Sequence, residues 1–211
     1  MVRIYFALFL LLCGAISRAD DKVKVTFDYE NNLETQGLMG VWDAYQLKAT
    51  LHLKGGDFKF YEVLMISVCN GQKKQHRIGF LPIMPDSTQL CVTAMAVDSM
   101  NCIVYVSPHI GSKVKIEIPT DQCLLIDYRN EDGYNLGFSI PLMAYSTGIC
   151  KEVNLGNGHV VKAHDICGLR FSKIPPSEWY EAYHIPNYVY FEAVPVKSID
   201  YGKLFNAVKN Q

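Results

Sequence analysis

The segment His164-Asp165-Ile166-Cys167 places a base, a carboxylate and a thiol close together. A cysteine beside a histidine can act as a nucleophile when the imidazole removes its proton. The same cysteine can instead pair in a disulfide, which is the favoured interpretation because the chain after residue 19 holds an even number of cysteines. A metal site at His159, His164 and Asp165 is not favoured, since residues five apart point to opposite faces of a regular strand.

Other polar groups also have interpretations that involve no catalysis. Asp127 with Glu131 and Asp132 resembles an acid/base couple, but acidic residues beside a glycine are typical turn formers. The basic run 73–77 is either a solvated loop or a patch for heparin or another acidic partner. The chain contains no GxSxG, HExxH, GxxxxGK or GxGxxG motif. We therefore predict a protein that is not an enzyme and that has no catalytic residue, metal or cofactor.

Aromatic residues are concentrated between positions 179 and 191. On a short helix, Trp179 and Tyr183 are four residues apart and share one face. On the strand that follows, Tyr188 and Tyr190 share a face. Amphipathic rings suit a contact surface for a protein or a sugar, whereas the alternative is a helix and an edge strand that cap the core. The candidate contact residues are Trp179, Tyr180, Tyr183, Tyr188 and Tyr190.

The N-terminus has the three-part pattern of a secretory signal peptide. Arg3 precedes an uncharged apolar run from Ile4 to Ile16, and Ser17-Arg18-Ala19 supplies small residues for cleavage. The apolar run is shorter than the about 20 residues that span a bilayer. We expect residues 1–19 to be the signal peptide and residues 20–211 to form a single domain of a secreted protein with no membrane span.

The cysteine count agrees with export. Cys13 belongs to the signal peptide, and an even number of cysteines remains. None of these has CxxC spacing, which argues against a zinc ribbon or a redox motif. In an oxidising compartment we expect three disulfides, whose pairing the sequence does not determine. The cysteines concerned are Cys69, Cys91, Cys102, Cys123, Cys150 and Cys167.

The composition indicates an ordered globular protein. The chain is 49% hydrophobic, 12% aromatic and 19% charged, which excludes a disordered chain. Its net charge of −1 argues against binding to nucleic acid, which needs a basic face for the phosphates.

Alternation of apolar and polar residues predicts strands over most of the chain. The alternation is clear in residues 22–29, 47–54 and 113–118, and each of these segments is expected to have one buried and one solvent-exposed face. Residues 63–68 and 91–97 are apolar on both sides and predict central strands. Residues 54–57 and Asn70-Gly71 are candidate hairpin turns.

These strands predict an all-β fold, an antiparallel sandwich or barrel of roughly ten short strands braced by disulfides. One or two short helices are expected near the C-terminus. The candidates are residues 177–184, after Pro175-Pro176, and residues 199–209.

Two tripeptides resemble family signatures. Gly40-Val41-Trp42 and Ile126-Asp127-Tyr128 resemble the GxW and TDY motifs of lipocalins, with isoleucine in place of threonine. The resemblance implies an eight-stranded barrel that carries a small apolar ligand.

We expect a secreted binding protein that acts on an extracellular protein, receptor or glycan. The alternatives are a lipocalin-like carrier of an apolar small molecule, a secreted hydrolase without a local motif, and a secreted toxin or effector.

Overall fold

The computed structural model describes residues 22–29, 33–54, 56–107, 111–120, 123–156 and 158–199. The predicted signal peptide lies outside these residues, as do residues 200–209 of the helix predicted over residues 199–209. Most of the described chain forms antiparallel strands and short helices are few, so the all-β prediction is confirmed in the coarser form of a mostly-β fold.

The larger sheet has six antiparallel strands in the order β7-β6-β5-β2-β1-β9. The strong alternation predicted at its centre is confirmed, because Leu47, Ala49 and Leu51 are buried on one face of β2. The strands are β1 (Lys22–Tyr29), β2 (Ala44–Leu53), β5 (Thr88–Asp98), β6 (Asn101–Ser107), β7 (Ser112–Glu117) and β9 (Tyr134–Asn135).

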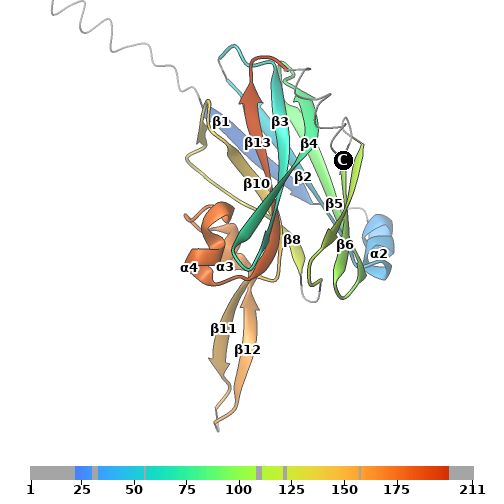
Figure 1. Ribbon diagram of the computed structural model, residues 1–211, viewed down its shortest axis with the longest axis vertical. Helices are drawn as coiled ribbons and strands as arrows, with labels where there is room; N and C mark the ends of the chain where they lie inside the picture. The colour runs from blue at the N-terminus through green and yellow to red at the C-terminus, as the bar shows by residue number, and fades with distance from the viewer. Residues whose placement is uncertain are drawn as a thin grey trace, which may run out of the picture.

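The second sheet has five strands in the order β4-β3-β13-β10-β8 and curls against the first (Figure 1). Every residue of β10 is buried, as expected for a strand covered on both faces. The strands are β3 (Phe60–Cys69), β4 (Gln72–Pro82), β8 (Leu124–Asp127), β10 (Ile140–Ser146) and β13 (Asn187–Val196).

The two sheets form an open, curled half-barrel rather than a closed barrel, since no strand of one pairs with a strand of the other among the described residues. Large side chains fill the space between the sheets, and Tyr61, Tyr145, Met65 and Leu90 are all fully buried there.

The turn residues predicted one hairpin correctly and another wrongly. Asn70 and Gly71 have φ angles of 48° and 79°, so both adopt the left-handed conformation that a two-residue hairpin between β3 and β4 requires. Residues 54–57 do not close a hairpin, because β2 and β3 belong to different sheets. Here the chain passes from one sheet to the other.

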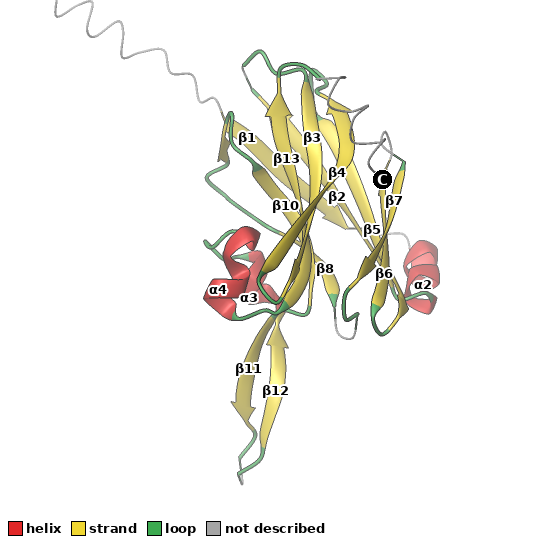
Figure 2. Ribbon diagram, in the orientation of Figure 1, coloured by secondary structure: helices red, strands yellow, loops and turns green. Residues whose placement is uncertain are grey.

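The helices are short and lie at two sides of the sheets (Figure 2). The helix predicted after Pro175-Pro176 is present as a 3₁₀ turn, η1 (Pro176–Glu178), followed by α4 (Trp179–Tyr183). The prediction missed α3 (Ile166–Arg170) and also α2 (Leu33–Val41), which lies near the N-terminus rather than the C-terminus. Two glycines within α2, Gly37 and Gly40, lower its intrinsic helix propensity.

A third sheet consists of two strands, β11 (Ile149–Asn154) and β12 (Val160–Asp165). This hairpin leaves the body of the molecule beside α3 and α4 (Figure 1). Counting it, the structure has more strands than the roughly ten predicted.

The disulfides predicted to brace the fold are not present in this structure, in which no disulfide joins the six described cysteines. Cys91 and Cys102 lie on adjacent strands but out of register, since Cys91 is opposite Ser107 and Cys102 is opposite Ala96. Cys150 is opposite His164 and not opposite another cysteine.

The two segments that resemble lipocalin signatures lie in different environments. Trp42 follows the end of α2 and is 59% exposed, whereas Asp127 is the last residue of the edge strand β8 and is fully buried. Together with the open half-barrel, this does not support the resemblance. No helix in the described part of the chain is long and apolar enough to cross a membrane.

Candidate functional site

The aromatic segment proposed as a contact surface belongs largely to the core. Trp179 is fully buried, and its Nε1 donates a hydrogen bond to the Ile174 carbonyl at 3.0 Å. Its ring contacts those of Tyr128 and Tyr188, with centroids 6.4 and 5.7 Å away. The tryptophan therefore packs α4 onto the sheet, which is the alternative that the sequence left open.

The remaining aromatic candidates divide between core and rim. Tyr188 and Tyr190 are buried, and the Tyr188 hydroxyl donates to the Pro176 carbonyl at 2.8 Å. Tyr180 and Tyr183 are half-buried, with the Tyr183 hydroxyl 2.8 Å from that of Ser172. Because buried rings cannot meet a partner, Trp179, Tyr188 and Tyr190 do not form the predicted surface.

The structure instead gathers charged residues around the Asp127 carboxylate, at the end of β8. Oδ1 accepts a hydrogen bond from the Tyr29 hydroxyl, and Oδ2 accepts one from Arg129 Nε. Arg170 Nε lies 2.6 Å from Oδ1 in an ion pair, while Arg170 Nη2 donates to the Tyr29 hydroxyl at 2.5 Å. A fully buried carboxylate thus contacts two guanidinium groups, as buried charges must be paired.

This cluster is suited to holding elements together rather than to proton transfer. Burial and the neighbouring Asp127 raise the pKa of Tyr29 to about 12, so its hydroxyl stays protonated at neutral pH. Arginine does not give up its proton in proteins. The cluster joins β1, β8 and α3, and the backbone N–H of Arg129 also donates to the Arg170 carbonyl at 3.2 Å.

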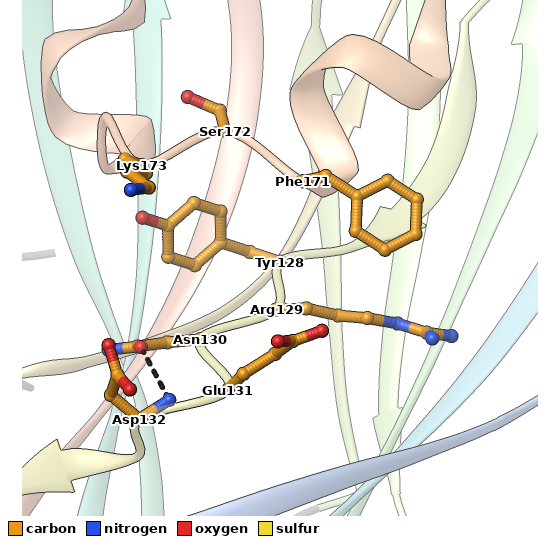
Figure 3. Close-up of a pocket in the computed structure, with 8 residues that line it drawn as sticks. All are labelled: Tyr128, Arg129, Asn130, Glu131, Asp132, Phe171, Ser172 and Lys173. Carbon is orange, nitrogen blue, oxygen red and sulfur yellow. Dashed lines mark hydrogen bonds between the residues drawn. The ribbon is translucent and has the colours of Figure 1, made fainter.

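A polar cavity of about 540 Å³ lies beside this cluster (Figure 3). In the view, the Tyr128 ring lies between Lys173 and Phe171, and the Arg129 side chain extends away from it. Opposite charges balance across the lining, with two basic and two acidic residues. The lining consists of Tyr128, Arg129, Asn130, Glu131, Asp132, Phe171, Ser172 and Lys173.

The β11–β12 hairpin is fixed to the body at its root. Asp165, the last residue of β12, accepts hydrogen bonds from the Gly168 N–H at 2.8 Å and from Lys151 Nζ at 2.5 Å. The Lys151 ammonium lowers the pKa of this carboxyl. Since Asp165 is also the N-cap of α3, and α3 ends at Arg170, the hairpin is linked directly to the buried Asp127 cluster.

Beyond the root, the hairpin is surrounded by solvent. Residues 150–154 and 160–164 are all exposed. Val153 and Val161 are directly opposite one another, so their side chains share a face. Leu155, two residues past Val153, is 66% exposed, and Val160 is exposed on the other face. The distal half of the hairpin therefore carries four exposed aliphatic side chains.

The histidines and cysteines near the root are not grouped as the sequence suggested, and Cys150, His164 and His184 line one cavity. Cys167 lies on α3, while His164 is opposite Cys150 and shares a cavity of about 350 Å³ with His184. No group of three or more His, Cys, Asp or Glu side chains is placed to hold a metal ion anywhere in the described residues. His159 lies at the tip of the hairpin, where its N–H donates to the Gly156 carbonyl.

Comparisons with protein families, with curated proteins and with solved structures return no match for this chain.

Sequence reasoning singled out Asp127 but not its contacts with Tyr29 and the two arginines, and it missed the exposed hairpin. The cluster joins residues far apart in the chain, and no local pattern signals it. The hairpin did leave a signal, because aliphatic residues alternate with polar ones on both sides of Asn157-Gly158.

Proposed function

We propose that this chain is a secreted, non-enzymatic binding protein that engages an extracellular protein through the distal half of the β11–β12 hairpin. The observation that carries the proposal is the set of exposed aliphatic side chains on that half, Val153, Leu155, Val160 and Val161. A two-stranded hairpin has little stability of its own in water, and apolar side chains held away from the core gain stability when a partner covers them.

The length of the hairpin supports contact with a partner. Strands of this size reach about 20 Å. The tip therefore lies beyond the body, where it can enter a depression on another protein without a clash between the two surfaces. Anchoring through Asp165 and Arg170 reduces the freedom that would be lost on binding.

The charges of the hairpin indicate what kind of partner fits. Lys151 pairs with Asp165, and Glu152 is directly opposite Lys162. Positive and negative charges thus balance within the hairpin, and the aliphatic face is its distinguishing feature. We infer a protein partner with an apolar surface rather than a glycan, since sugars are bound by aromatic rings and convergent polar groups.

Affinity capture from extracellular fluid tests this function. The bait is the secreted chain, compared with a V153S/L155S variant and with a V97S/M100S control. Val97 and Met100 are also exposed aliphatic residues, but they lie at the β5–β6 turn. We expect a protein that is captured by the wild type and the control and lost with the hairpin variant. Capture of the same proteins by all three, or enrichment of lipid or glycan alone, would contradict the proposal.

A further inference from the structure

Another cavity, of about 500 Å³, lies between the β3–β4 hairpin and the edge strand β7. One side is formed by Ser67, Lys74 and His76, and the other by Lys115 and Glu117. These residues come from different sheets, so the cavity lies at the mouth of the half-barrel where the two sheets separate.

Positive charge dominates this mouth. Lys73, Lys74 and Lys115 line it together with a single carboxylate, that of Glu117. Lys73 Nζ donates to the Ser177 carbonyl at 2.6 Å, so its ammonium group is directed toward η1 and α4 and the two ammonium groups left for the cavity are those of Lys74 and Lys115. Within the described residues, none of these three lysines forms an ion pair. The ammonium groups of Lys74 and Lys115 therefore outnumber the single lining carboxylate around a concave space.

His76 adds a hydrogen-bonding group to the same space. Burial and the neighbouring Lys74 lower the pKa of His76, so the ring is neutral at pH 7. A neutral imidazole can donate one N–H to an anionic oxygen. The Ser67 hydroxyl, which donates to the Lys74 carbonyl at 3.3 Å, lies on the same lining.

Two other charged cavities lack this combination of excess positive charge and sufficient volume. In the cavity beside the Asp127 cluster, Glu131 and Asp132 balance Arg129 and Lys173. A second basic group on β1 and β2 surrounds only about 110 Å³, which is too small for a sugar ring with its substituents. That group consists of Lys22, Lys24, His52 and Lys54.

We propose that the mouth between β4 and β7 binds an anionic ligand that carries sulfate or phosphate groups, with Lys74 and Lys115 as its principal contacts. Ammonium groups bind such oxyanions as point charges. A cavity of this volume matches the range typical of small-ligand sites and suits one or two rings of a sulfated oligosaccharide. This site is separate from the hairpin, so it does not depend on the protein partner proposed above.

Calorimetric titration of the full secreted chain tests the site. The probe is a heparin-derived hexasaccharide, with inorganic phosphate as a second arm. A K74Q/K115Q variant is compared with a K24Q/K54Q control, which removes the same charge from the other basic group. We expect the first variant to bind the hexasaccharide at least about tenfold more weakly and the control to bind it like the wild type.

The two arms identify the source of the anion. Tighter binding of the hexasaccharide than of phosphate supports a sulfated glycan, and equal binding supports a free phosphate group at the same lysines. Equal weakening in both variants would show non-specific attraction and overturn the proposal. The absence of binding by either probe to the wild type would overturn it as well. Unchanged melting temperatures of both variants exclude misfolding as the cause of a loss.

Discussion

The fully buried Asp127 carboxylate accepts a hydrogen bond from the Tyr29 hydroxyl, although the two residues are 98 positions apart. The same carboxylate contacts Arg129 and Arg170, so one side chain connects β1, β8 and α3. Because α3 directly follows β12, this cluster also fixes the root of the exposed hairpin.

Removing the negative charge should destabilise the fold strongly. In D127N, two guanidinium groups lose their buried counter-charge, and we expect the free energy of unfolding to fall by about 3 kcal/mol. The matched control is D28N, because Asp28 pairs with Lys48 at 3.4 Å on the surface, where such pairs contribute less than about 1 kcal/mol. Urea unfolding measures both. Equal losses in the two variants would show that the Asp127 cluster has no special role.

Tyr29 should make stability depend on pH in alkaline solution. Its pKa is raised from 10.0 to about 12 in the folded chain, so its stabilising contribution is complete below pH 10 and is lost as the pH rises through 12. We expect the free energy of unfolding of the wild type to decrease more steeply over this range than that of Y29F. Denaturant unfolding at pH 9, 10, 11 and 12 measures the difference. Parallel curves would contradict the assigned hydrogen bond.

The cysteines should differ in reactivity according to their exposure. Cys69, Cys150 and Cys167 are exposed, whereas Cys102 is fully buried, and burial raises the pKa of its thiol to about 11. We expect iodoacetamide to modify the three exposed cysteines of the folded protein and to spare Cys102 until the chain is unfolded. Peptide mass spectrometry identifies the modified positions. Failure of unfolded, unreduced protein to react would reveal disulfides that this structure does not contain.

Gly148 should be essential for the geometry of the hairpin root. It has a φ angle of +92°, and a Cβ atom there would lie 3.1 Å from the Asp165 backbone. In G137A, φ is similar at +86° but the added methyl group meets open space. Both substitutions cost about 1 kcal/mol or more through backbone strain. We therefore expect a larger fall in melting temperature for G148A, with weaker partner binding in that variant alone.

The sequence allowed a good prediction of local structure and a poor one of long-range arrangement. Alternation placed strands such as β1 and β2 correctly, because one face of each is buried. The turn residues at 54–57 did not reveal that the chain passes from one sheet to the other at this point. The same residue types suit a hairpin turn and a connection between two sheets. The Asp127 cluster depends on contacts between distant segments, which residue spacing does not encode.

The aromatic segment shows why composition alone misplaced the site. Rings such as Trp179 and Tyr188 suit an interface and a core equally well, and burial decides between them. The β11–β12 hairpin is the opposite case, because it exposes residue types that are typical of a core. Its valines would ordinarily indicate a buried strand, and their exposure became evident only when the path of the chain was known.

The affinity of the captured partner for the wild type and for V153S/L155S is the most direct test of the proposed function. Surface plasmon resonance with the purified partner measures it, with V97S/M100S as the control. We predict that the hairpin variant binds at least about tenfold more weakly, a loss of about 1.4 kcal/mol, while the control binds like the wild type. Equal affinities of all three proteins would contradict the assignment of the β11–β12 hairpin as the binding site.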